Sequence, residues 1–229
     1  MEGGALIART LEVTFNASGA AEAGARGRVV CVVDVVDSST SAEAALAAGA
    51  VAVLGAAPAD ADPPVAVRPD AVGMRAVALA GEHDAPVLVV AEPRVGSQEE
   101  RQERAAAVLN GIQGAAIEWE LVPNQGAELA SLASCEGRIV VIVSTTGGTA
   151  FDAALAAGAP AACFATTARV RGMTGREVAE AGITRALALC DLVRADLTIV
   201  AASANSLDDV LAAHELARRL IDGGHLTLH

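Results

Sequence analysis

The heptapeptide AALAAGA occurs twice, at residues 44–50 and at 153–159. Each copy follows an apolar, β-branched run and a turn rich in Ser and Thr, and precedes a second apolar segment. Short apolar runs bounded by turn residues are typical of buried strands, and the alanine-rich stretch ends at glycine, as helices commonly do. The shared order argues against a coincidence of alanine-rich composition. Residues 28–56 and 138–166 are therefore predicted to form two similar β-turn-α-β units with parallel strands.

The remainder of the chain alternates between strand-like and helix-like segments. Such alternation predicts an α/β fold, here three layers (α/β/α) with a mostly parallel sheet. A Pro- and Asp-rich loop is expected at 58–69, and with no long polar linker in the sequence, residues 1–229 are expected to form one domain. Outside the repeats, strands are predicted at 76–80, 87–90 and 197–202, and helices at 98–109, 126–133, 175–192 and 207–222.

The net charge of −12 argues against two classes of partner. Nucleic acids and anionic membrane surfaces are bound through basic patches, so neither is expected as a partner. No apolar run reaches the roughly 18 residues of a membrane span, and the N-terminal sequence lacks the pattern of a secretory signal. The four cysteines contain no CxxC pair and predict reduced thiols in a cytoplasmic protein. The alanine-rich helix faces leave a homo-oligomer open.

Polar turns follow both repeat strands, at residues 37–41 and 144–149. In doubly wound sheets ligands bind at the carboxyl ends of the strands, and the N–H groups at a helix start suit an anion. Neither turn is a P-loop, because the GxxxxGK[ST] pattern is missing. Two readings are open: the hydroxyls of Ser39, Thr40 and Thr149 contribute to a ligand site, or they only cap the helices that follow.

Five short motifs in order along most of the chain resemble the 2-phosphosulfolactate phosphatase family. The family's D-V-L-R-A-S/T-T is similar to DVVDSST at residues 34–40, and its T-T-T-N-G-T is similar to STTGGT at 144–149. Its S-L-E-D is similar to SLDD at 206–209. Its G-E-R and G-N-S-P steps are similar to GEH at 81–83 and PNQG at 123–126. Each motif is weak alone, but five in this order are hard to produce by chance.

The resemblance implies Mg²⁺-dependent hydrolysis of a small acidic phosphomonoester such as 2-phosphosulfolactate, a reaction of coenzyme M biosynthesis. Mg²⁺ is usually held by one or two carboxylates together with water, so carboxylates at motif positions are the expected ligands. The expected catalytic residues are Asp34, Glu82 and Asp209, and the expected metal ligands are Asp34, Glu82 and Asp208. The expected substrate contacts are Ser39, Thr40, Asn124, Thr145, Thr146, Gly148 and Thr149.

Plainer structural roles compete with these assignments. An unpaired carboxylate after an apolar strand is costly, so Asp34 needs either a metal or a hydrogen-bonding partner in a neighbouring turn. Glu82 is equally well explained as a solvated loop residue. Asp208 and Asp209 lie where a helix N-terminus favours negative charge, which by itself accounts for them.

The chain also departs from the family pattern. Asp37 and His83 stand where the family has arginine, and Gly147 stands where it has asparagine. Arginine binds phosphate or sulfonate through two parallel hydrogen bonds, so its loss bears directly on the substrate. The alternative function is therefore a homologue without phosphatase activity, or with an altered substrate, that binds a small anion or another metabolite.

Other residues are candidates to replace the missing arginines. Arg94, Arg169 and Arg171 lie near predicted strand ends, and the sequence Glu92-Pro93-Arg94 is a second candidate for the G-E-R step. The spacing between Glu82 and Asn124 exceeds the family's by about 25–30 residues, a length that a surface loop absorbs at small entropic cost.

Overall fold

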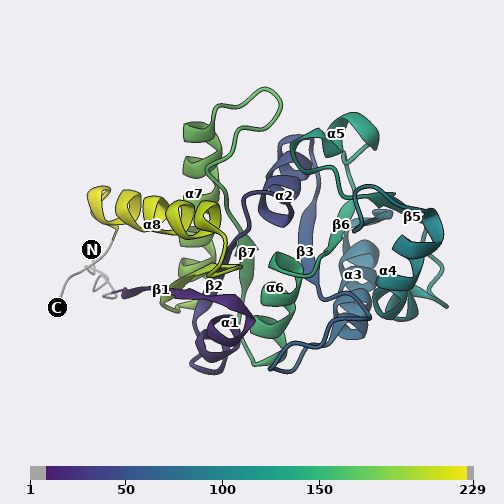
Figure 1. Ribbon diagram of the computed structural model, residues 1–229, viewed down its shortest axis with the longest axis horizontal. Coiled ribbons are helices and arrows are strands. Elements are labelled where there is room, and N and C mark those ends of the chain that lie inside the picture. Colours follow the sequence, from purple (N-terminus) through teal and green to yellow (C-terminus); the bar gives the residue numbers. More distant parts are fainter. Residues whose placement is uncertain (1–8, 226–229) are drawn as a thin grey trace, which may run out of the picture.

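The computed structural model describes residues 9–225, which form an α/β fold of parallel strands interleaved with helices (Figure 1). Among these residues no helix combines the length and apolar character that a membrane crossing requires. The strands are β1 (Leu11–Phe15), β2 (Val29–Val33), β3 (Ala52–Ala56), β4 (Val87–Ala91), β5 (Trp119–Pro123), β6 (Ile139–Val143), β7 (Ala162–Phe164) and β8 (Leu197–Ala201). The helices are α1 (Asn16–Ala25), α2 (Ser38–Ala47), α3 (Pro69–His83), α4 (Gln98–Ile112), the 3₁₀ turn η1 (Gly126–Glu128), α5 (Leu129–Leu132), α6 (Gly147–Ala156), α7 (Gly175–Val193) and α8 (Leu207–Asp222).

The strands form two four-stranded sheets, in the orders β1-β8-β2-β7 and β3-β6-β4-β5. Every pairing in both sheets is parallel. The predicted α/β class and parallel strands are confirmed, and the helices cover the sheets in a way consistent with three layers. The strands are nevertheless divided between two sheets instead of forming the one mostly parallel sheet that was expected.

This division arises because the two repeat units exchange strands. The unit β2-α2-β3 begins in the first sheet and ends in the second. The unit β6-α6-β7 begins in the second sheet and ends in the first. Consequently β2 pairs with β7, with Cys31 opposite Cys163, and β3 pairs with β6, with Leu54 opposite Val141. Each unit therefore completes the sheet that the other unit begins.

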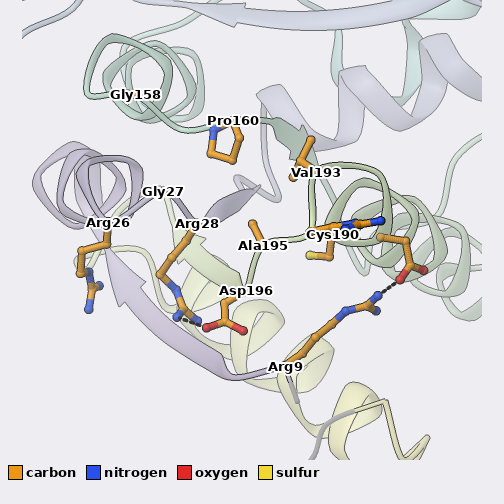
Figure 2. Close-up of a pocket in the computed structure, with 12 residues that line it drawn as sticks. Arg9, Arg26, Gly27, Arg28, Gly158, Pro160, Cys190, Val193, Ala195 and Asp196 are labelled. Carbon is orange, nitrogen blue, oxygen red and sulfur yellow. Dashed lines mark hydrogen bonds and ion pairs between the residues drawn. The ribbon is translucent and has the colours of Figure 1, made fainter. Parts of the chain in front are cut away.

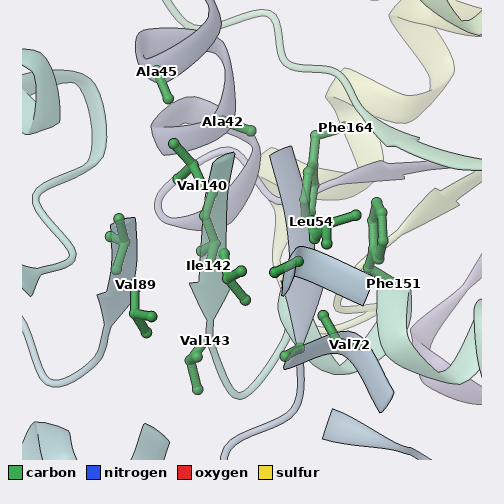
Figure 3. Packing of buried hydrophobic residues seen from close by; sticks show 14 of the residues in the cluster. Ala42, Ala45, Leu54, Val72, Val89, Val140, Ile142, Val143, Phe151 and Phe164 are labelled. Atoms are coloured by element: carbon green, nitrogen blue, oxygen red, sulfur yellow. The ribbon is translucent and has the colours of Figure 1, made fainter. Parts of the chain in front are cut away.

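The core is built from aliphatic strands and small-residue helices. Every residue of β2, β4, β6 and β8 is buried, and all of them except Thr198 of β8 are apolar. Phe151 of α6 stacks on Phe164 of β7 with ring centroids 4.9 Å apart (Figure 3). They pack over Gly55 of β3, where an added Cβ would lie 2.7 Å from an atom of each phenylalanine. Glycine at this position lets the two rings approach the strand.

Most predicted elements are confirmed, one is wrong and one is only partly formed. β2, β6 and α8 begin and end at the predicted residues. The predicted strand at 76–80 lies inside α3, which starts with Pro69 in its first turn and Asp70 near its N-terminus. The run AVALA suits either structure, and alanine's helix propensity together with these N-terminal signals decides for helix. The structure also contains β1, α1 and β5, which were not predicted, and a 3₁₀ turn with a single helical turn in place of the helix expected at 126–133.

Candidate functional site

The turns that follow β2 and β6 meet at the carboxyl ends of the strands. Asp34, directly after β2, accepts hydrogen bonds through Oδ2 from Thr146 Oγ1 at 2.8 Å and from the Gly147 N–H at 2.9 Å. Ser38 Oγ and Ser144 Oγ are 2.5 Å apart and share a further hydrogen bond. The repeat thus brings together two turns that are more than 100 residues apart, and Asp34 has the turn partner expected of a buried carboxylate.

Glu92, directly after β4, accepts hydrogen bonds from Thr145, the residue before Thr146. Its Oε2 accepts hydrogen bonds from the N–H of Thr145 at 3.2 Å and from its Oγ1 at 2.9 Å. Arg104 Nη2, from α4, lies 3.3 Å from the same Glu92 oxygen and 2.5 Å from Thr145 Oγ1. Thr145 and Thr146 are therefore each bound by a carboxylate from a different strand, and Thr145 is exposed to solvent.

Asp209 brings a third carboxylate to this edge from α8. Ser206 caps the helix by accepting the Asp209 N–H, and Asp209 Oδ1 accepts the Val35 N–H at 2.8 Å. Burial raises the pKa of Asp209 to about 6, and the negative charge of Asp34 adds to the rise. Burial, followed by the charge of Asp34, also raises the pKa of Asp37, and burial raises the pKa of Glu92. Raised carboxyl pKa values concentrated at one edge are typical of functional sites.

Two arginines reach the same edge. Arg94 Nη2 lies 2.9 Å from Asp37 Oδ1 and also donates to the Val36 carbonyl at 3.2 Å. Arg104 Nη1 lies 3.0 Å from Asp60 Oδ2 in the loop after β3. A guanidinium group thus stands against Asp37, the position at which the family has its arginine. We call the group formed by Asp34, Asp37, Glu92, Arg94, Arg104, Thr145, Thr146 and Asp209 the strand-end cluster.

The other predicted hydroxyls bind their own turns. Ser39 Oγ accepts the Asp34 N–H and donates to the Val32 carbonyl. Thr40 Oγ1 donates to the Val35 carbonyl, and Thr149 Oγ1 to the Ser144 carbonyl at 3.1 Å. The helix-cap reading is wrong, because no side-chain cap is formed at the start of α2 or α6. These hydroxyls fix the turns that carry the strand-end cluster.

Asn124 and Gly148 are buried beside the cluster. Asn124 follows β5, and its Oδ1 accepts hydrogen bonds from Ser41 Oγ and from the Gly126 N–H. Its Nδ2 is buried without a hydrogen-bond partner among the described residues. Gly148 packs so closely that an added Cβ would lie 2.3 Å from the Ala56 carbonyl oxygen. Gly148 therefore serves the packing of α6 against β3.

Glu82 lies away from the cluster, and Asp208 is the exposed neighbour of Asp209 in α8. Because residues 76–80 are helical, Glu82 does not follow a strand: it is exposed near the C-terminus of α3, at the amino-terminal side of β4. His83 ends the same helix. Asp208 is exposed in the first turn of α8, whereas the adjacent Asp209 is buried. The structure therefore does not bring Glu82 together with Asp34.

The sequence contains a signal for Glu92 that Arg104 and Asp60 lack. Glu92 lies two residues after the end of the strand predicted at 87–90, and Glu92-Pro93-Arg94 is the second candidate for the G-E-R step. Arg104 and Asp60 carried no such signal, because one lies within a helix and the other in a loop.

The carboxylates of the cluster are few for a metal site enclosed by the protein. Within residues 9–225 no group of three or more His, Cys, Asp or Glu side chains is arranged to hold a metal ion. Mg²⁺ usually needs only one or two carboxylates and keeps several waters. Burial is the main cause of the raised pKa of Asp209 and the negative charge of Asp34 adds to it, so a cation near both carboxylates would relieve the part that is due to repulsion. The donors present therefore fit a water-rich Mg²⁺ site, not one enclosed by the protein.

A cavity of about 640 Å³ lies at the opposite, amino-terminal edge of the first sheet (Figure 2). Four arginines line it, and three of them form ion pairs: Arg9 with Asp191, Arg26 with Glu12 and Arg28 with Asp196. Helices α1 and α7 end here, where their C-termini favour positive charge. The cavity contains none of the predicted site residues, and three of its four arginines have structural partners.

Comparison with known proteins adds no family assignment: no protein-family model matches the chain, and no curated protein matches its sequence.

Proposed function

We propose that this protein is a Mg²⁺-dependent phosphatase that hydrolyses a small acidic phosphomonoester, such as 2-phosphosulfolactate, at the strand-end cluster. The observation that carries the proposal is the threonine pair, in which Thr145 is bound by Glu92 and Thr146 by Asp34. A hydroxyl that donates to a carboxylate has a lone pair left to orient water. The order of the family-like motifs along the chain supports the same function.

In this proposal Asp34 and Asp209 hold the metal ion. Bound Mg²⁺ supplies neutralisation of the phosphoryl charge and a water of lowered pKa. Asp34 accepts its two hydrogen bonds from Thr146 and Gly147 through Oδ2 alone. Among residues 9–225 no hydrogen bond to Asp34 Oδ1 is found, so in this proposal Oδ1 is the oxygen that binds the metal ion.

Glu92 acts as the proton acceptor in this proposal. All three of its hydrogen bonds go to Oε2, which leaves Oε1 to take a proton from a water held by Thr145. Burial raises the pKa of Glu92 above its usual value, and a general base works best when its pKa approaches the working pH. Arg94 and Arg104 bind the anionic groups of the substrate, the role of the arginines missing from positions 37 and 83.

The proposal places the reaction in the cytoplasm. The four cysteines are buried free thiols, which suits a reducing compartment.

The test is phosphate release from 2-phosphosulfolactate and a panel of small phosphomonoesters, with Mg²⁺ and with a chelator. We expect turnover that requires Mg²⁺ and that prefers substrates with a second negative group, because two arginines stand at this edge. A folded protein that releases no phosphate from any member of the panel contradicts the proposal.

A second candidate function is binding of a small anion without hydrolysis. The observation that favours it is that both arginines are paired with acids of the chain, Arg94 with Asp37 and Arg104 with Asp60. Saturable binding of 2-phosphosulfolactate without turnover, with or without Mg²⁺, would establish this second function in place of the first.

A further inference from the structure

Arg101 of α4 is buried, at 8% exposure, beneath the turn that connects β4 to α4. Its Nε donates to the Pro93 carbonyl at 3.0 Å, and its Nη1 to the Ser97 carbonyl at 2.9 Å. Its Nη2 donates to the carbonyls of Gly96 at 2.9 Å and Arg94 at 3.4 Å. A single guanidinium group therefore binds the backbone along the whole turn.

The charge of Arg101 is balanced by peptide carbonyls and not by an acid. Within residues 9–225 no Asp or Glu forms an ion pair with it, and all four of its hydrogen bonds go to carbonyl oxygens. Buried arginines are normally paired with acids, so a salt bridge does not explain this one. The guanidinium group carries its N–H donors in one rigid plane, which suits it to hold several peptide groups at fixed angles.

The start of α4 does not require Arg101. Ser97 and Glu100 form a capping box, in which the Ser97 N–H donates to Glu100 Oε2 at 2.7 Å and the Glu100 N–H to Ser97 Oγ at 3.1 Å. Such a box satisfies the first N–H groups of a helix by itself. The carbonyls of Pro93 and Gly96, by contrast, accept hydrogen bonds from no described residue other than Arg101. The task of Arg101 therefore lies in the turn before the helix.

This turn carries two side chains of the strand-end cluster. Glu92, at its beginning, accepts the hydrogen bonds of Thr145 through Oε2. Arg94, two residues later, lies 2.9 Å from Asp37 through Nη2. Both side chains leave a backbone that Arg101 holds from below, so Arg101 acts on the cluster through that backbone.

We infer that Arg101 is a positioning residue that fixes the turn after β4 and so holds Glu92 against Thr145. The inference deepens the proposed function and rests on it, since it names the group that orients the proton acceptor. The contact between Glu92 and Thr145 can nevertheless be measured without turnover.

The test compares two substitutions that keep the positive charge. Arg101→Lys replaces the planar group with a single ammonium group, which cannot reach the separated carbonyls of the turn. Arg28→Lys is the matched control, because Arg28 has a side chain that is 12% exposed and donates to the carbonyls of Thr10 and Leu197 at the opposite edge of the first sheet. Urea midpoints show how much stability each variant loses. Arg101→Gln serves as the second variant if Arg101→Lys does not fold.

The first measurement is the pH dependence of the Thr145 amide chemical shift. This amide donates to Glu92 Oε2 at 3.2 Å, so its shift should follow the ionisation of Glu92, and Glu92→Gln identifies that titration by abolishing it. In Arg101→Lys its amplitude is expected to fall by about half or more, because hydrogen bonds weaken steeply when their geometry is lost. Arg28→Lys should titrate as wild type does.

The second measurement is phosphate release with Mg²⁺. Arg101→Lys is expected to lower kcat about tenfold or more, since a misplacement of about 1 Å can cost about 100-fold in rate. Arg28→Lys should stay within about twofold of wild type, because it leaves the turn intact.

A Thr145 titration in Arg101→Lys equal to that of wild type would overturn the inference, as would its absence from wild type. An equal loss in Arg28→Lys, or an unchanged kcat of Arg101→Lys in an active enzyme, would also overturn it. If the titration is lost only in Arg101→Lys and wild type releases no phosphate from any ester, the proposed function fails while the positioning of Glu92 by Arg101 stands.

Discussion

At the residue scale, Asp152 combines a structural task with an unfavourable charge. It is buried on α6 and receives two backbone N–H groups, yet burial outweighs them and raises its pKa from 3.8 to about 6. The folded protein therefore holds this proton more tightly than the unfolded chain does. Stability from this group is present below about pH 4 and is lost as the pH rises towards 6.

We predict that Asp152→Asn removes this part of the pH dependence. The interval from 3.8 to about 6 corresponds to at most about 3 kcal/mol, so the stability of wild type relative to the variant should fall by about 1–3 kcal/mol from pH 4 to pH 7. Urea unfolding of both proteins at these two pH values gives the double difference, in which the other acids cancel. A relative stability that does not change with pH would contradict the raised pKa.

The residues of the site differ in how visible they were in the sequence. Asp34 was predictable because a carboxylate directly after a buried strand demands a partner. Glu92 also follows a buried strand. However, the strand predicted at 76–80, which is helical in the structure, placed Glu82 at a strand end and made it the first candidate for the G-E-R step. Arg104 and Asp60 were not predictable, because their meeting depends on how a loop packs against a helix.

At the scale of elements, α6 begins in contact with the end of β2. An added Cβ at Gly147 would lie 2.6 Å from Asp34 Oδ2 and 2.8 Å from Ser38 Cβ. These contacts give a physical reason for glycine at the position where the family has asparagine: Asp34 and Ser38 already fill the space.

We predict that Gly147→Ala destabilises the fold by about 1–3 kcal/mol, since the new methyl group forces apart the two turns. Gly81 of α3 is the matched control, because an added Cβ there meets no atom within 4 Å. Gly81→Ala should leave stability unchanged or raise it by up to about 1 kcal/mol through better helix propensity. Chemical unfolding of both variants tests the pair, and equal stabilities would show that the contact at Gly147 is easily relieved.

Elements with several agreeing signals were predicted well. β2 and β6 are uniformly apolar, and α8 has Ser206 as its cap and acids in its first turn. The prediction for residues 76–80 was wrong because a five-residue run of alanine, valine and leucine fits both strand and helix. β5 was missed because it is only partly buried and begins with two exposed residues, Trp119 and Glu120.

At the scale of the whole molecule, the repeat was visible in the sequence but the exchange of strands was not. Local patterns predict a β-turn-α-β unit and do not say whether its two strands join the same sheet. Here β2 pairs with β7 and β3 with β6, so the information lies in contacts between residues more than 80 positions apart. This exchange is what places the turns after β2 and β6 against each other.

Because neither repeat unit contains a complete sheet, we predict that the two halves of the chain do not fold separately. A break between Glu136 and Gly137, both exposed in the turn before β6, leaves β2 and β3 without their partners in one fragment and β6 and β7 without theirs in the other. Each purified fragment should show little cooperative unfolding by circular dichroism, and mixing the two should restore it. Cooperative unfolding of either fragment alone would contradict the interlocked arrangement.

The strand-end cluster is tested most directly by comparing two glutamates in one phosphate-release assay with Mg²⁺. Glu92 accepts a hydrogen bond from Thr145 in the cluster, whereas Glu82 is exposed near the C-terminus of α3, at the amino-terminal side of β4. Glu92→Gln is expected to lower turnover about 100-fold or more, in the range of a lost general base, while Glu82→Gln should retain the activity of wild type. Loss of activity in Glu82→Gln, or full activity in Glu92→Gln, would contradict the placement of the active site at the strand-end cluster.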